Sequence, residues 1–224
     1  MADYRDTELG RETVYSDQYD ASLLYPIPRK KARDGVGDST LFTGVDLWTA
    51  FEISWLNQHG LPQVAIGEFI FPCTSEAIVE SKSFKLYLNS FNQSRFSSME
   101  EVSQVLYTDL SAASGSTVEV ILYEIEEYNG FKPIAEPDAI CLDKRPVAIE
   151  CYEPDCSTLQ SDRAVQADET LCSHLLRTNC PVTDQPDWAS IYISYKGPQI
   201  DRDGLLKYIV SFIDRCNFMP IKKN

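Results

Sequence analysis

The sequence has little of what a nucleic-acid-binding surface requires. Its 224 residues include 20 Lys and Arg against 34 Asp and Glu, which gives a formal net charge of −14. Binding to nucleic-acid phosphates depends on clustered Lys and Arg. We therefore expect no direct nucleic-acid partner, and any anionic ligand would have to be met by a local group of basic side chains.

The usual components of a zinc site, a secretory signal and a membrane span are also missing. The chain has two histidines and seven cysteines, and no two cysteines have the CxxC spacing from which zinc sites commonly start. An odd number of cysteines is typical of thiols in a reducing compartment. The N-terminus is polar and no long apolar run follows. The sequence thus predicts no metal, no membrane span and a cytoplasmic location.

Apolar residues are frequent enough for a packed core, since 43% of the chain is hydrophobic and 11% aromatic. We expect residues 1–40 to form an irregular arm, rich in turn residues, with residues 23–25 docked on the core. A first module follows. It begins with a strand in which Phe51, Ile53 and Trp55 alternate with polar residues and share one buried face.

This first module is predicted to span residues 41–135 and to continue with a strand, two helices and another strand. The expected positions are 57–60 for a hairpin loop, 63–71 for the second strand, 81–91 and 98–113 for the helices, and 117–125 for the last strand. Ser81 is expected to be the N-cap of the first helix, and Gly115 is expected to end the second.

A proline-rich stretch of little periodicity, residues 136–168, is predicted to link this module to a second one at residues 169–224. Two strands are expected there, at residues 170–179 and 188–195, followed by a helix that Asp201 caps. The second module therefore begins as the first does, with a hairpin and then a helix.

The segment between these two strands is the clearest candidate for a catalytic site. Pro181 and Pro186 hold the residues before them extended, so we expect Cys180 and Asp187 on a stiffened loop that directs both side chains at one ligand. A thiolate nucleophile beside a carboxylic acid suits covalent catalysis. The alternative is a small buried cysteine and a solvated turn aspartate.

A second candidate lies at the start of the first predicted helix. Ser81, Lys82 and Lys85 stand where backbone N–H groups and the helix dipole attract anions. Two lysines oppose that dipole, so we expect a negative group near them. The alternative is an ordinary amphipathic helix with solvated lysines.

Two motifs resemble those of the QueF family of nitrile reductases. Residues 80–87 read Glu-Ser-Lys-Ser-Phe-Lys-Leu-Tyr and agree with the family signature at all eight positions. Residues 173–180, with Gln-Pro-Asp-Trp at 185–188, resemble the nucleophile loop of the family's two-module form. In that form the signature lies in the first half and the cysteine in the second, as it does in this sequence.

The resemblance implies an α+β fold of tandem tunnelling-fold modules, each an antiparallel sheet with a helix pair. It also implies the NADPH-dependent reduction of 7-cyano-7-deazaguanine to the 7-aminomethyl compound, in queuosine biosynthesis, by a homodimer or larger homo-oligomer. By position, it assigns Cys180 as the nucleophile that forms a thioimidate, Asp187 as the proton donor, Val79, Glu80 and Ser81 as substrate contacts, and Ser81 and Lys82 as NADPH contacts.

The sequence departs from the family pattern after the helix that begins at Asp201. A His-Glu pair, a second helix, the last strands and an Arg- and Gly-rich stretch are not found there. We therefore expect the second module to be incomplete and the chain to be C-terminally truncated. A second hypothesis is then an inactive family member that binds a deazapurine or serves in assembly. A pterin- or purine-converting enzyme of the same fold would need a metal site or a histidine relay, for which His59 and His174 offer little.

Overall fold

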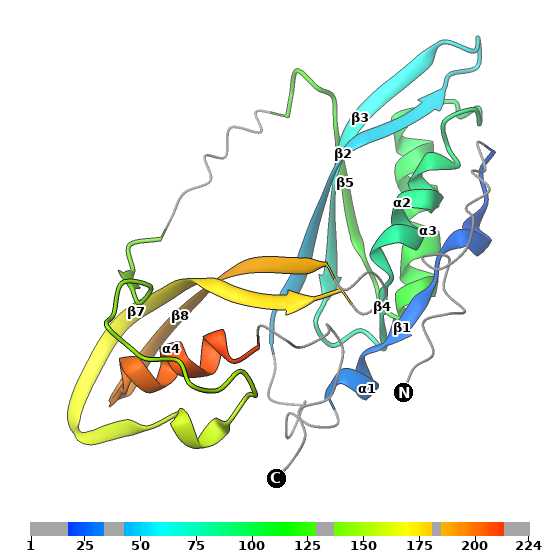
Figure 1. Cartoon of the computed structure of the whole chain (residues 1–224). Coiled ribbons are helices and arrows are strands. Elements are labelled where there is room, and N and C mark those ends of the chain that lie inside the picture. Colours follow the sequence, from blue (N-terminus) through cyan, green and yellow to red (C-terminus); the bar gives the residue numbers. More distant parts are fainter. Residues whose placement is uncertain (1–17, 34–42, 129–136, 181–184, 213–224) are drawn as a thin grey trace. The chain divides into compact units, whose positions relative to one another are not determined.

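The computed structural model describes residues 18–33, 43–128, 137–180 and 185–212. Its contacts divide the chain into two compact units, with the boundary between residues 133 and 134. Each unit combines helices with antiparallel strand pairs, so the α+β class is confirmed (Figure 1). Among the described residues no helix is long and apolar enough to cross a bilayer.

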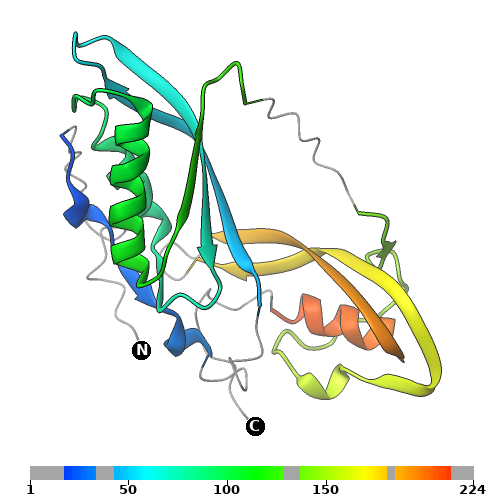
Figure 2. The ribbon, with the colours of Figure 1, turned by 180° about the vertical axis from the view of Figure 1, so that it is seen from behind.

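The first unit is built on a three-stranded antiparallel sheet in the order β2-β3-β5. Its main elements are β2 (Val45–Leu56), β3 (Pro62–Pro72), α2 (Ser81–Asn89), α3 (Met99–Ser114) and β5 (Glu119–Tyr123). The helices lie side by side over one face of the sheet (Figure 2), and the core between them includes Phe69, Tyr87 and Phe91. The predicted order of two strands, two helices and a strand is confirmed.

The prediction for the buried face of β2 is wrong at one residue. Ile53 and Trp55 are buried, but Phe51 is 67% exposed. The register between β2 and β3 shifts after Ala50, which marks a β-bulge. Because the extra residue reverses the alternation, Trp48 and Ala50 pack against the core in place of Phe51.

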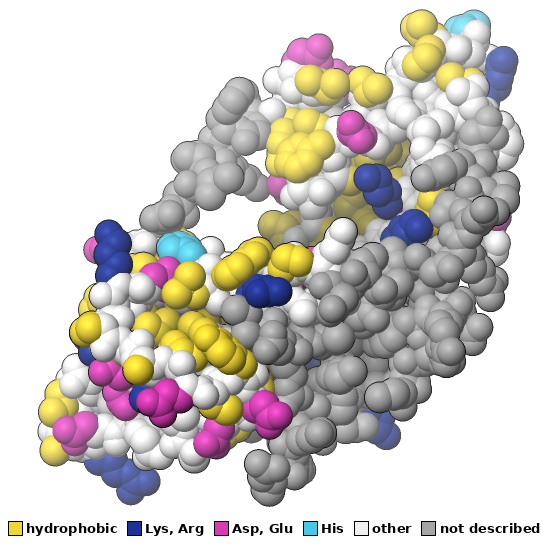
Figure 3. All heavy atoms as spheres, in the orientation of Figure 1, with side chains coloured by type: hydrophobic (Ala, Val, Ile, Leu, Met, Phe, Trp, Pro, Cys, Tyr) yellow, Lys and Arg dark blue, Asp and Glu magenta, His cyan; other side chains and the backbone are white. Residues whose placement is uncertain are grey.

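The β-bulge leaves apolar side chains on the sheet face opposite the helices. Val45, Leu47, Phe51 and Val64 are all exposed. Hydrophobic side chains are visible at the surface in the region of β2 and β3 (Figure 3). A group of this kind is typical of a surface that meets another protein chain.

Part of the predicted irregular arm has regular structure. β1 (Pro26–Pro28) pairs antiparallel with β4 (Ala77–Val79), and α1 (Arg29–Arg33) follows β1. Leu23 and Leu24 pack against the core of the first unit, as predicted. Both short strands are only three residues long, so their pairing carries no periodic signal that the sequence could have revealed.

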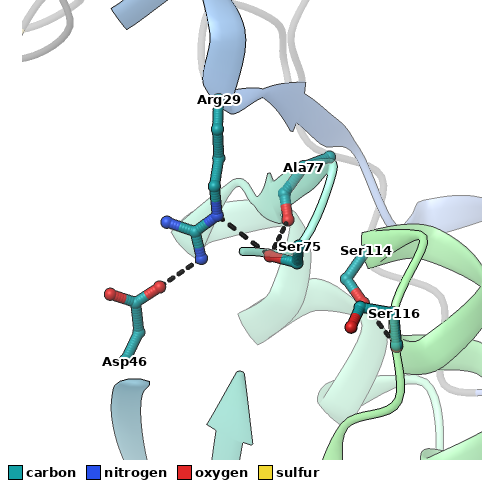
Figure 4. A network of polar contacts seen from close by, with 6 residues as sticks. All are labelled: Arg29, Asp46, Ser75, Ala77, Ser114 and Ser116. Carbon is teal, nitrogen blue, oxygen red and sulfur yellow. Dashed lines mark hydrogen bonds and ion pairs between the residues drawn. The ribbon is translucent and has the colours of Figure 1, made fainter. Parts of the chain in front are cut away.

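Arg29 ties this arm to the sheet. Its guanidinium forms an ion pair with Asp46 of β2, and its Nε donates a hydrogen bond to Ser75 Oγ over 2.9 Å (Figure 4). Ser75 Oγ in turn donates to the carbonyl oxygen of Ala77, also over 2.9 Å. Through these contacts one side chain joins α1, β2 and β4.

The second unit is dominated by a long hairpin of β7 (Ser161–Asn179) and β8 (Pro186–Ile200). The short β6 (Ile140–Cys141) pairs parallel with β7 at its outer edge. α4 (Arg202–Val210) lies along one face of the hairpin (Figure 1). A 3₁₀ helix, Cys156–Thr158, precedes β7. β7 begins inside the stretch predicted as a linker, because its first residues pair with the end of β8.

A small core holds α4 to the hairpin. Leu205, Leu206 and Ile209 of the helix pack with Leu171 of β7 and with Ile193 of β8. Asp201 caps α4, as predicted, and its side chain accepts a hydrogen bond from the N–H of Asp203. Ile191, Ile193 and Tyr195 alternate along β8 and all pack against this core.

Candidate active site

The two residues predicted to carry the chemistry lie at one end of the β7–β8 hairpin. β7 ends at Asn179 and Cys180 follows directly, while Asp187 is the second residue of β8 and pairs with Thr178. Asp187 is therefore a strand residue and not a loop residue, which corrects the prediction. Pro186 is compatible with this strand because it is the first residue, where proline is tolerated. Residues 181–184 lie outside the described part.

The strand ladder places the thiol and the carboxyl on one face. Cys180 N–H donates to the carbonyl oxygen of Gln185 over 2.8 Å, so the ladder extends one pair beyond β7. Opposite residues of an antiparallel pair share a face, and successive residues alternate. Thr178, Asp187, Cys180 and Gln185 therefore share one face. Cys180 and Asp187 are diagonal neighbours, a relation that separates Cα atoms by about 7–8 Å.

This face is the one that α4 covers further along the hairpin. Asp187 lies on the same face of β8 as Ala189, Ile191 and Ile193, because every second residue of a strand shares a face. The two isoleucines pack in the core with α4. Near the hairpin end the cover is thinner: Asp187 is exposed and Cys180 half-buried. A small molecule can therefore approach both groups from the same side.

The opposite face of this end carries a residue that the sequence reasoning missed. Arg177 lies across from Trp188, with its guanidinium carbon 5.8 Å from the centroid of the indole ring. Its Nη2 donates to Asn179 Oδ1 over 3.2 Å. Such a cation–π contact stabilises the strand pair, and this strand pair is the one that carries Cys180 and Asp187.

The other predicted site residues belong to the first unit, at the N-terminus of α2. The N-cap is Glu80 and not Ser81, which corrects the prediction. The Glu80 carboxylate accepts hydrogen bonds from the N–H groups of Lys82 at 2.9 Å and Ser83 at 2.7 Å. Serine outranks glutamate as a cap in general, but two carboxylate oxygens satisfy two N–H groups together. Glu80 is further held by its own N–H, which donates to the carbonyl oxygen of Tyr25.

This arrangement changes how an anion could bind there. The negative group expected near the lysines is the carboxylate of Glu80 itself, and it occupies N–H groups that a phosphate would otherwise use. Neither Lys82 nor Lys85 has a carboxylate partner among the residues that the structure describes. A phosphate would therefore be met by the exposed hydroxyl of Ser81 and by the ammonium group of Lys82.

Val79 differs from its neighbours because its side chain belongs to the core. It is 2% exposed and pairs with Pro26 across β1 and β4. A substrate contact at this position is therefore left to the backbone.

Comparison with known proteins decides the family. The family model described as "Nitrile reductase, 7-cyano-7-deazaguanine-reductase N-term" matches residues 15–122. The protein named NADPH-dependent 7-cyano-7-deazaguanine reductase of Burkholderia multivorans is 50% identical over 213 residues, which cover 94% of this chain and 77% of the relative. The reductase of the same name from Burkholderia vietnamiensis is 51% identical over 214 residues, with the same coverage. The chain belongs to the QueF family.

The QueF assignment covers both groups of candidate residues. The family model spans the α2 start with Glu80, Ser81 and Lys82. Alignments over 94% of the chain also include Cys180 and Asp187. The predicted family is confirmed, whereas the role of each of these residues stays a prediction.

One further group of residues was not expected from the sequence. Cys141, Cys172 and His174 come together in the second unit, although Cys141 is 31 positions before Cys172. Their spacing matches no zinc motif, so only the parallel pairing of β6 with β7 reveals them.

Proposed function

We propose that this chain is an NADPH-dependent reductase that converts 7-cyano-7-deazaguanine to 7-aminomethyl-7-deazaguanine, a step in queuosine biosynthesis. The observation that carries the proposal is the pairing of a thiol and a carboxyl on one face of the β7–β8 hairpin. It occurs in a chain that is 50% identical to proteins named for this activity. The carbon of a nitrile is electrophilic, and a thiolate is the side-chain group best suited to attack it.

In this mechanism Cys180 adds to the nitrile carbon. A C–S bond forms, one π bond of the C≡N group breaks, and the nitrogen takes a proton from Asp187. The product is a thioimidate, a covalent link between substrate and enzyme. Because Cys180 and Asp187 share a face, the carboxyl can reach the nitrogen on the side where negative charge develops.

The covalent link opens again during reduction. NADPH, when bound, supplies one hydride to the thioimidate carbon and a second hydride to the imine that follows. Between these steps the C–S bond breaks and Cys180 leaves as a thiolate. Overall, the nitrile, two NADPH and two protons give the amine and two NADP⁺, so Cys180 is regenerated unchanged.

The α2 start supplies the recognition groups. A carboxylate offers about four acceptor positions. The helix cap uses one on each oxygen of Glu80, and the hydroxyl of Ser81 donates a further bond to Oε1 over 3.4 Å. The remaining positions suit the N–H donors of a deazaguanine ring. The hydroxyl of Ser81 and the ammonium group of Lys82 suit the phosphates of NADPH, and the fit depends on side chains because Glu80 occupies the helix N–H groups.

A mass-spectrometric experiment tests the nucleophile. Incubating the protein with 7-cyano-7-deazaguanine without NADPH should add the mass of one substrate, and Cys180→Ala should abolish the addition. Asp187→Asn should slow the addition by about 10²-fold or more, the usual size of a general-acid effect. Cys73→Ala serves as the matched control and should react normally. An adduct that persists in Cys180→Ala would contradict the assignment.

We also propose that the chain works as a homodimer or larger homo-oligomer. The exposed apolar residues on the outer face of β2 and β3 support an interface there, because burying them removes apolar surface from water. Light scattering should give a mass above 25.4 kDa. Phe51→Lys should shift the mass toward a single chain, and a monomeric parent protein would rule out the proposal.

A further inference from the structure

Three side chains that can bind a metal ion come together where β6 borders the β7–β8 hairpin. One ligand atom from each of Cys141, Cys172 and His174 lies within 4.8 Å of the other two. Cys172 is buried, His174 half-buried and Cys141 exposed, so the group is sheltered but reachable from water. The structure leaves both cysteines as thiols.

The fold brings these residues together through strand register. Cys141 of β6 pairs directly with Cys172 of β7 in the parallel ladder, and Leu142 N–H donates to the carbonyl oxygen of Cys172 over 2.9 Å. His174 is two residues beyond Cys172 and shares its face. Leu171 packs with α4, so alternation places the three ligands on the face away from α4.

The imidazole is already oriented by a neighbouring side chain. His174 Nδ1 lies 2.7 Å from Ser190 Oγ, which leaves Nε2 as the nitrogen for a ligand. Metal-binding histidines usually have their other ring nitrogen held by such a partner. The ring also contacts Tyr192 edge-on, with centroids 6.2 Å apart.

A carboxylate beside the cluster is incompletely satisfied. Asp143 Oδ2 accepts a hydrogen bond from the backbone N–H of His174 over 3.1 Å. Asp143 Oδ1 is buried and has no hydrogen-bond partner among the described residues. A buried carboxylate oxygen without a donor is costly, and a cation bound next to His174 would offset that cost.

We propose that Cys141, Cys172 and His174 bind a zinc ion. Two thiolates and an imidazole are ligands that Zn²⁺ prefers. Zn–S and Zn–N distances of about 2.3 and 2.0 Å in a tetrahedral site put the ligand atoms about 3.5–3.8 Å apart. The cluster therefore has to contract by only about 1 Å. Water fills the fourth position, as it does in many three-ligand zinc sites.

The site is separate from the proposed reaction. His174 precedes Cys180 by six residues, which is about 20 Å along a strand. The zinc ligands also lie on the hairpin face opposite Cys180. The ion acts as a clip that fastens β6, a strand of two residues at the sheet edge, to the hairpin. This inference goes beyond the proposed function and does not depend on it.

Alkylation of the unmodified chain tests the site. The fully reduced protein is treated with iodoacetamide, with and without Zn²⁺, and each thiol is followed by peptide mapping. With free zinc at about ten times its dissociation constant, alkylation of Cys141 should slow about tenfold, because only the metal-free fraction reacts. Cys151 and Cys156 are exposed thiols of the same chain and should keep their rates. Unchanged Cys141 reactivity, or equal slowing at all three thiols, would overturn the proposal.

A matched pair of variants tests the geometry. Ser190→Ala removes the partner of the imidazole and should lower zinc affinity about 10-fold to 100-fold, as losses of such partners generally do. Ser194→Ala changes an exposed serine on the same face of β8 and should leave the affinity unchanged. Competition with a chromophoric chelator measures both. Equal affinities in the two variants and in Cys141→Ser would identify the binding as an adventitious ion only.

Discussion

Glu80 is expected to have two functions, capping α2 and binding the substrate, and a pair of substitutions separates them. Its carboxylate accepts hydrogen bonds from the N–H groups of Lys82 and Ser83, and the residue is 9% exposed. Glu80→Ala leaves both N–H groups unpaired, so the free energy of unfolding should fall by about 1–2 kcal/mol. Glu80→Ser should recover most of that loss, because serine is among the best N-cap residues.

Substrate binding should not follow stability in these variants. Both lack the carboxylate, and a hydrogen bond to a charged group contributes about 1.5–3 kcal/mol. We therefore expect both to bind 7-cyano-7-deazaguanine roughly 10-fold to 150-fold more weakly. Urea denaturation measures the stability. Isothermal titration in a Cys180→Ala background measures the affinity, since no covalent product can form there.

One result for Glu80→Ser would contradict the proposed substrate contact. If Glu80→Ser is stable and binds the substrate as tightly as the parent, Glu80 is a helix cap and nothing more. Glu100 provides the control, because it is an exposed acid in the first turn of α3. Glu100→Ala should leave substrate affinity unchanged, and a loss there equal to that in Glu80→Ser would show that overall charge, and not a specific contact, controls binding.

Two further predictions concern the second unit. A Cβ on Gly204 would lie 2.0 Å from the carbonyl oxygen of Thr158. This steric clash costs about 1–3 kcal/mol, which outweighs the gain of about 1 kcal/mol that alanine brings to a helix. Gly204→Ala should therefore lower the melting temperature. Hydrogen bonds from Tyr195 and then from Arg202 lower the pKa of Glu169. The stability that the ionised Glu169 contributes to the fold is therefore complete above the ordinary pKa of about 4.3. It is lost as the pH falls through the lower folded-state value. The stability difference between the parent and Glu169→Gln should accordingly shrink in acid, and a difference that stays constant from neutral pH into acid would contradict this.

The elements predicted best from sequence are those fixed by local signals. α3 begins within a residue of the predicted start, with Ser98 as its N-cap, and Gly115 ends it as expected, with φ 68°, a conformation that glycine adopts without strain. Asp201 caps α4 in the same way. In each case the groups that interact lie within a few residues of one another along the chain. A short stretch of sequence is therefore enough to predict the interaction.

The features that sequence could not reveal depend on residues far apart in the chain. The pairing of β1 with β4 brings Pro26 to Val79, and the pairing of β6 with β7 brings Cys141 to Cys172. Each strand involved on the N-terminal side has two or three residues. A segment that short has no measurable period, so its partner is decided by tertiary packing alone.

A β-bulge in β7 decides whether the proposed catalytic residues can cooperate. Ser173 pairs with Ile191 and Leu176 pairs with Ala189, so three steps along β7 match two steps along β8. Without the extra residue, Arg177 would pair with Asp187, and Cys180 would point to the opposite face. With it, Cys180 and Asp187 share a face. The residue identities at the hairpin end therefore carry the proposed chemistry, but the register upstream of them sets the geometry. That register is a property of the whole ladder, which is why the motif indicates a candidate nucleophile but not the direction of its side chain.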